Sequence, residues 1–149
     1  MFRGQFVHTI DAKGRISIPA RFRDALASEG GSQFILTPAP FDPCLHLHPL
    51  RAWEDFEQRI AELPSLDRNV VRLRRMYVSA AIECDVDRAG RVLVPPHLRD
   101  KACLRKDVLW AGMGRSIEIW SKEKWDEALT MTDAERDEFQ RVVTEQLRI

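Results

Sequence analysis

Two basic clusters combine residue types and spacings that could bind a phosphate or a nucleic-acid base. Each lies in an Asp-x-x-Gly-Arg motif, with Lys13 and Arg15 in the first and Arg88 and Arg91 in the second. The planar guanidinium group of arginine fits phosphate, or the O6/N7 edge of guanine, with two hydrogen bonds, whereas lysine acts as a point charge. The sequence therefore offers anion- and base-binding chemistry at two places.

The acidic residue of each motif leaves the role of its arginine open. Asp11 could orient Arg15 toward a ligand, or it could serve only the turn. In the alternative interpretation, Arg15 and Arg91 form salt bridges with Asp11 and Asp87 across their own hairpins. The residues alone do not decide between these interpretations.

The sequence contains few residue patterns typical of catalysis or of cofactor binding. It has no nucleophile elbow, no phosphate-binding loop and no Gly-x-Gly-x-x-Gly motif. His46 and His48 would share one strand face, which could suit a metal, but no carboxylate or cysteine stands at a supporting spacing. The cysteines, Cys44, Cys84 and Cys103, form no Cys-x-x-Cys pair and are expected to be free thiols. We expect no enzymatic activity, no catalytic residue, no metal and no cofactor.

The elements that must position the first basic cluster can be predicted from its flanks. Apolar and polar residues alternate before and after the motif, which predicts two strands joined by a hairpin turn at residues 11–14. Asp11 can bond to the turn backbone, and Gly14 can adopt a positive φ. A helix should follow, with Pro19 at its first position and the Gly30-Gly31 pair at its end.

The same unit occurs twice in the chain. Residues 11–24 align without a gap with residues 87–100 at an offset of 76, and six of these fourteen positions are identical. The similarity continues through two later strands to Trp53 and Trp125. Each copy is therefore predicted to contain strand, turn, strand, short helix, strand, strand and helix. No long flexible linker separates the copies, so they should pack into one body.

Apolar stripes at helical spacing predict further helices between and after the copies. The stripes and their boundaries are Trp53, Phe56, Ile60 and Leu63 before Pro64; Leu66, Val70, Leu73 and Tyr77 after a cap at Ser65; and Phe139, Val143 and Leu147 after a Thr132/Glu135 capping box. The expected organisation is repeat 1 at 5–52, connecting helices at 53–80, repeat 2 at 81–124 and C-terminal helices at 125–149.

Charge is segregated along the 149-residue chain although its formal net charge is zero. The formal charges of residues 1–24, 25–65, 66–120 and 121–149 are +3, −4, +4 and −3. A protein with one basic face can bind a polyanion despite a neutral total. The sequence has no apolar run of the ~20 residues that a membrane helix needs, and no secretory leader pattern. We therefore expect a cytoplasmic protein with no membrane partner.

The whole pattern resembles the MraZ family, and the resemblance covers essentially the entire chain. Two stretches carry it: Phe2-x-Gly4-x-x-x-His8-x-Ile10-Asp11-x-Lys13-Gly14-Arg15-Ile16-x-Ile18-Pro19-x-x-Phe22-Arg23 and Asp87-x-x-Gly90-Arg91-Val92-x-Val94-Pro95-x-x-Leu98-Arg99. That family belongs to the AbrB-like group of DNA-binding proteins. The resemblance implies an α+β, β-rich fold, in which two tandem swapped-hairpin β-barrel repeats form one pseudo-symmetric body with connecting and C-terminal helices.

The resemblance also implies a function and its site. It implies a transcriptional repressor that binds short direct repeats of double-stranded DNA in the promoter of the division and cell-wall operon, including its own gene. It further implies ring-shaped homo-oligomers and association with the nucleoid. Carried onto this sequence, the DNA-binding residues are Asp11, Lys13, Arg15 and, by position, Arg3, with Arg88 and Arg91 secondary because Ala89 occupies the place of Lys13.

Two other classes of function remain as alternatives. One is a self-assembling ring or interaction protein without sequence-specific DNA binding, in which the Asp–Arg pairs are internal and the charged segments contact neighbouring subunits. The other is an enzyme with a metal at His46 and His48, which the missing supporting ligands disfavour. Retention on heparin at low salt distinguishes DNA binding from the first alternative.

Overall fold

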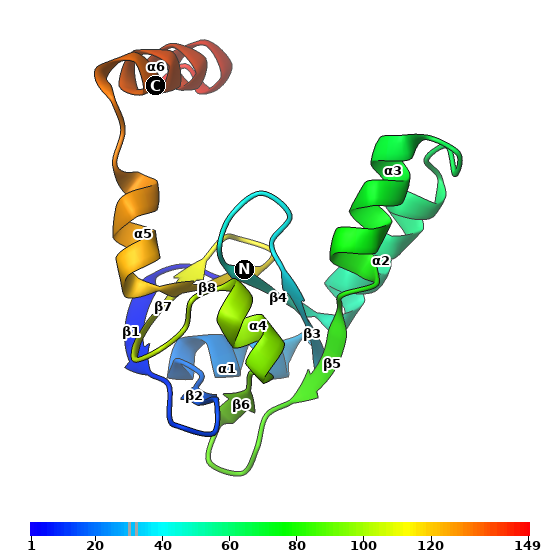
Figure 1. Cartoon of the computed structure of the whole chain (residues 1–149), viewed down its shortest axis with the longest axis vertical. Helices are drawn as coiled ribbons and strands as arrows, with labels where there is room; N and C mark the ends of the chain where they lie inside the picture. The colour runs from blue at the N-terminus through cyan, green and yellow to red at the C-terminus, as the bar shows by residue number, and fades with distance from the viewer. Residues whose placement is uncertain (30, 32) are drawn as a thin grey trace.

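The computed structural model describes residues 1–29, 31 and 33–149 (Figure 1). The strands are β1 (Gln5–Thr9), β2 (Arg15–Ser17), β3 (Gln33–Pro38), β4 (Leu45–Pro49), β5 (Ile82–Asp85), β6 (Arg91–Leu93), β7 (Asp107–Gly112) and β8 (Ile117–Ser121). The helices are α1 (Ala20–Ser28), α2 (Leu50–Ala61), α3 (Arg68–Leu73), α4 (Pro96–Lys101), α5 (Lys122–Leu129) and α6 (Asp133–Leu147), with a π-helical turn η1 (Arg74–Val78) after α3. The fold is α+β, with antiparallel sheets.

The order of elements confirms the repeat. The series β1-β2-α1-β3-β4-α2 of the first copy recurs as β5-β6-α4-β7-β8-α5 in the second. The helices α3 and η1 connect the copies, and α6 follows the second. The alternating patterns and turn residues therefore predict the elements correctly in both copies.

The two copies exchange their first hairpins. Strand β1 pairs with β7 of the second copy, and β5 pairs with β3 of the first. The main sheet has the order β1-β7-β8-β4-β3-β5, and β2 and β6 form a separate two-stranded ribbon. Within the described residues no pairing joins the edge strands β1 and β5, so the closed barrel that the resemblance implies is not observed. Strands β1 and β5 stay at the two edges of the main sheet, while β2 and β6 pair with each other in the ribbon.

One apolar core joins the two copies. Ile16 and Phe22 of the first copy and Val92 and Leu98 of the second are at most 1% exposed and belong to one cluster. Trp110 on β7 lies in the same cluster. This confirms that the copies pack into one body, and each copy buries its ribbon strand and short helix against the other.

Helix boundaries differ from the predictions by one or two residues. Pro19 is the N-cap of α1 and not its first helical residue, with φ −52° and ψ 136°. The cap of α3 is Asp67 and not Ser65, because the Asp67 carboxylate accepts from the N–H groups of Asn69 and Val70. Helix α1 is capped at its C-terminal end by Glu29. The predicted stop at Gly30-Gly31 involves Gly30, which lies outside the described residues.

The connecting helices pack on the outer side of β3. Trp53 of α2 and Tyr77 of η1 contact Ile35 in a second apolar cluster. Leu63 and Leu66, which the sequence placed on the apolar stripes, are 44% and 92% exposed because they lie in the loop between α2 and α3. The stripes therefore extend less far than predicted.

Helix α6 projects away from the sheet at the end of the chain (Figure 1). Its cap is confirmed, because the Thr132 hydroxyl accepts from the Glu135 N–H at 3.2 Å and donates to the Glu135 carboxylate at 3.1 Å. Its apolar side chains remain uncovered, with Phe139 56% and Leu147 65% exposed. The stripe is thus not a packing surface within this chain. None of the described helices combines the length and apolarity needed to cross a membrane.

Candidate nucleic-acid interface

The first basic turn is built by the side chain of Asp11. Its Oδ1 accepts hydrogen bonds from the backbone N–H groups of Lys13 and Arg15, both at 2.9 Å. The N–H of Gly14 donates to the Asp11 carbonyl at 3.0 Å, and Gly14 has φ +90°. This is an Asx-type turn closed by a residue in a conformation that favours glycine.

The second turn repeats this geometry. Asp87 Oδ1 accepts from the N–H groups of Ala89 and Arg91, again at 2.9 Å, and Gly90 has φ +76°. These bonds use only the backbone N–H groups of the second and fourth residues after the aspartate. The turn therefore accepts either Lys13 or Ala89 at the second of these positions. Asp and Gly therefore fix the turn, and the residues between them are available for binding.

Each arginine is held by its own aspartate, but only along one edge. Arg15 Nε donates to Asp11 Oδ2 at 2.7 Å, and Arg91 Nε donates to Asp87 Oδ2 at 3.0 Å. Among the described residues, no hydrogen bond or ion pair engages the Nη atoms of Arg15 or Arg91. Both side chains remain about one third exposed. The internal salt bridge exists, and it also orients the guanidinium group, so the two interpretations of the motif are compatible.

The aspartates stay ionised because of these contacts. The backbone hydrogen bond from Arg15 and, secondarily, its guanidinium group lower the pKa of Asp11 to about 2. The equivalent contacts from Arg91 lower the pKa of Asp87. At neutral pH each turn therefore presents an arginine whose direction is fixed by a charged partner.

The fold brings the two turns together at one end of the molecule. Strands β2 and β6 pair with Ile16 opposite Val92, and both loops lie at the end of the view opposite α6 (Figure 1). The carbonyl of Gly14 accepts from the Val94 N–H at 2.8 Å, and that of Gly90 accepts from the Ile18 N–H at 2.9 Å. Each turn is thus fastened to the strand end of the other copy.

Two arginines from the short helices pack against the glycines of the turns. Arg99 of α4 lies under Gly14 and donates to the Ala12 carbonyl at 3.5 Å, while Arg23 of α1 lies under Gly90. The buried Nε of Arg99 has no hydrogen-bond partner among the described residues. Sequence reasoning assigned no role to this pair. The available signal was their alignment at the repeat offset of 76.

The candidate DNA-binding residues fall into two places. Lys13 and Arg88 are exposed on the turns beside Arg15 and Arg91, so both copies contribute exposed cations to the surface at this end of the molecule. Arg3 is exposed too, but it precedes β1 while the turn follows it. The length of that strand, roughly 13 Å or more, separates the backbone of Arg3 from the turn. The structure does not bring Arg3 to this surface.

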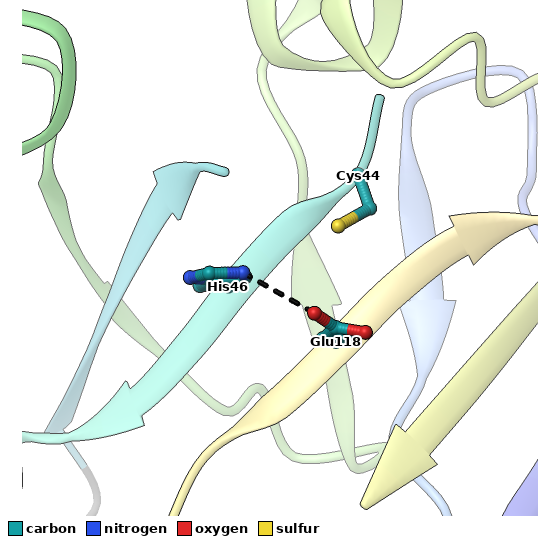
Figure 2. Close-up of side chains that lie close together, drawn as sticks. All are labelled: Cys44, His46 and Glu118. Atoms are coloured by element: carbon teal, nitrogen blue, oxygen red, sulfur yellow. Dashed lines mark ion pairs between the residues drawn. The ribbon is translucent and has the colours of Figure 1, made fainter. Parts of the chain in front are cut away.

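One conclusion about the histidines needs correction. The sequence showed no cysteine or carboxylate at a supporting spacing, yet the structure places Cys44 and Glu118 beside His46 (Figure 2). Glu118 comes from the neighbouring strand β8, where it lies directly opposite His46. Cys44 could have been found, because it stands two residues before His46 and shares its face. The sequence alone did not reveal Glu118, because it reaches His46 only through the pairing of strands from different repeats.

Comparison with known proteins gives a consistent result over nearly the whole chain. The model of one protein family, described as “MraZ protein, putative antitoxin-like”, matches residues 1–75 and again residues 77–148. A relative from Caldanaerobacter subterraneus subsp. tengcongensis is 41% identical over 139 residues, which cover 93% of this chain and 94% of the relative. Relatives from Carboxydothermus hydrogenoformans and Azotobacter vinelandii are 44% and 41% identical, covering 85% and 84% of this chain and 85% and 82% of the relatives. All three carry the name “Transcriptional regulator MraZ”.

Proposed function

Since this chain belongs to the MraZ family of transcriptional regulators and not to a family of enzymes, we propose that the paired Asp-x-x-Gly-Arg turns form its DNA-reading surface. The observation that carries this proposal is the fixed direction of Arg15. Asp11 holds Nε at 2.7 Å, and no described contact occupies the two Nη atoms. An arginine held in this way can present its outer edge to guanine or phosphate without losing further side-chain freedom.

The first turn is the principal reader in this proposal. Lys13 and Arg15 place two cations on one turn, so one can address a base while the other contacts an adjacent phosphate. The second turn has Ala89 at the position of Lys13 and carries Arg88 instead, which moves its cation along the loop. We assign Arg88 and Arg91 a supporting role, and Asp11 the role of orienting Arg15.

Resemblance to the MraZ family supports a proposal about the DNA targets. We infer that the chain acts in the cytoplasm on nucleoid DNA, as a repressor at direct repeats in the promoter of the division and cell-wall operon that includes its own gene. A ring of subunits presents several turns along one face, which suits DNA sites that recur in the same orientation. Arg3, at the far end of β1, would contact DNA only through a different subunit or a bent duplex.

Binding to promoter DNA is expected to depend steeply on salt. A complex with ~6 or more phosphate contacts gives a plot of log K against log salt concentration with a slope steeper than about −5. The measurement is a mobility-shift or anisotropy series with DNA from upstream of the chain's own gene. DNA of the same length with scrambled repeats is the control and should bind more weakly at every salt concentration. A slope near zero, or equal affinity for both DNAs, contradicts the proposal.

An assembly larger than a dimer is expected in solution. The exposed apolar side chains of α6 and the alternating charge of the chain provide unlike surfaces for head-to-tail contacts, which close into rings when the rotation permits. Light scattering should report this mass for the wild-type chain and a smaller mass for Phe139→Asp, with Gln140→Asp, an exposed position on the same helix, as the control for one added negative charge. Monomers alone at micromolar concentration contradict this part of the proposal.

The second candidate function is assembly without sequence-specific DNA binding. The observation that favours it is the internal Asp–Arg pair in each turn. It predicts a large assembly that does not distinguish promoter DNA from scrambled DNA, so the same two measurements separate the candidates.

A further inference from the structure

Three side chains of types that bind metals lie together on the outer face of the main sheet, at β4 and β8, away from the two turns. Cys44 precedes β4, His46 lies on β4 and Glu118 lies on β8 (Figure 2). The Cys44 Sγ, one His46 nitrogen and one Glu118 oxygen all lie within 4.8 Å of one another. The cluster is distinct from the proposed DNA-reading surface.

The spacing of these atoms is close to that of a zinc coordination sphere. His46 Nε2 and Glu118 Oε2 are 3.4 Å apart. Nitrogen and oxygen ligands at ~2.0–2.1 Å from a tetrahedral zinc ion lie about 3.4 Å from each other. The thiol would bind at ~2.3 Å, about 3.5 Å from each of the other two ligands. Its sulfur now lies within 4.8 Å of both.

The surroundings hold the ligands in the orientation that coordination requires. His46 Nδ1 is hydrogen-bonded to the Tyr77 hydroxyl at 2.7 Å, so when that nitrogen carries the proton, Nε2 has a lone pair directed at Glu118. Trp120 Nε1–H donates to Glu118 Oε1 at 3.0 Å, which leaves Oε2 for a cation. Partners of this kind behind the ligands fix their orientation in protein metal sites.

The cluster is open to solvent on one side, where a further ligand could bind. Cys44 is 2% exposed, whereas the side chains of His46 and Glu118 are 20% and 14% exposed. Solvent can therefore reach the cluster from the imidazole and carboxylate side. A thiolate, an imidazole and a carboxylate together favour a borderline-soft cation such as Zn²⁺ over Mg²⁺ or Ca²⁺, which prefer oxygen ligands alone.

We propose that Cys44, His46 and Glu118 bind one zinc-type divalent cation, with water as the fourth ligand. The cation would join β4 of the first repeat to β8 of the second, at one of the strand pairs that cross between the copies. Its effect is to brace the interface between the repeats. This proposal departs from the sequence-based expectation that the chain binds no metal.

Cobalt titration of the full-length protein, after removal of metals by a chelator, tests the site. Co²⁺ should produce the visible bands of tetrahedral coordination and a near-ultraviolet thiolate-to-cobalt band, saturating at one Co²⁺ per chain. Zn²⁺ should displace it and raise the thermal unfolding temperature, as any ligand of the folded state does. Tyr77→Phe should weaken binding roughly 10- to 100-fold through loss of the contact behind His46.

Variants identify the ligands and supply the matched control. Cys44→Ser should abolish the thiolate band, and the near-isosteric Glu118→Gln should weaken Co²⁺ binding at least about 10-fold. Cys103→Ser removes a different thiol and should bind Co²⁺ as the wild type does. Failure of the wild type to bind overturns the proposal. Undiminished binding by Glu118→Gln, or loss of the thiolate band in Cys103→Ser, also overturns it, even if Cys44→Ser fails to fold.

Discussion

Replacing Arg15 with alanine is expected to weaken binding to promoter DNA by about 1–3 kcal/mol per recognised site, which is roughly 5- to 150-fold. The reason is the loss of a two-bond contact from an arginine that Asp11 has already oriented. When several subunits bind one stretch of DNA, the loss multiplies across the assembly. Lys13→Ala should weaken binding as well. The measurement is affinity for promoter DNA at one fixed salt concentration.

Arg91→Ala is the matched control for this substitution. It removes the equivalent side chain, paired to Asp87 in the same way, from the turn that lacks a lysine. Both variants should keep their fold and assembly size, because the turn bonds come from backbone N–H groups to Asp11 and Asp87. An equal or larger loss of affinity for Arg91→Ala would make the second turn the reader. Unfolding or dissociation of Arg15→Ala would show that its salt bridge is structural.

Gly14→Ala should destabilise the chain by about 3 kcal/mol or more. A left-handed conformation costs a residue with a side chain roughly 1–2 kcal/mol, and Gly14 has φ +90°. An added Cβ would also lie 2.5 Å from the Val94 carbonyl oxygen and 2.8 Å from Arg99 Nε. The clash falls on backbone of the other copy, so it opens the contact between the repeats. Urea unfolding measures the effect.

Substitutions at two other glycines are expected to cost less stability and serve as controls. A Cβ at Gly90, where φ is +76°, would meet the side chain of Arg23, which can move away, so Gly90→Ala should cost less than Gly14→Ala. Among the residues that the structure describes, a Cβ at Gly31 would come nearest to the backbone of Gln33, at 3.7 Å, and should change stability little. If Gly14→Ala is as stable as Gly31→Ala, the two copies do not approach each other closely at Gly14 and Val94.

The features that could be predicted from sequence are those set by neighbouring residues. Three such features are present: the Asx-type turn at Asp11, the equivalent turn at Asp87 and the helix cap at Thr132. Each depends on residues within four positions of one another. Pro19 was misplaced by one position because a proline suits both the end of an extended segment and the start of a helix.

The features that were missed depend on contacts between distant segments. Residues 99 and 14 meet because the hairpins are exchanged, and no local pattern states which strand β2 will pair with. Glu118 reaches His46 for the same kind of reason, through the register of β4 and β8. The stripe of α6 predicts a helix but not what covers its apolar face, because a periodic apolar face looks the same whether its partner lies in the same chain or in another.

The exchange of hairpins within a single polypeptide has a consequence for how the two halves can evolve. In a homodimer built this way, every substitution appears twice, and the pair falls apart on dilution. Here the covalent connection through α2, α3 and η1 keeps the halves together at any concentration. Each half can also mutate alone. The first turn carries Lys13 where the second carries Ala89 and Arg88, so one polypeptide presents two tips whose cations stand at different positions.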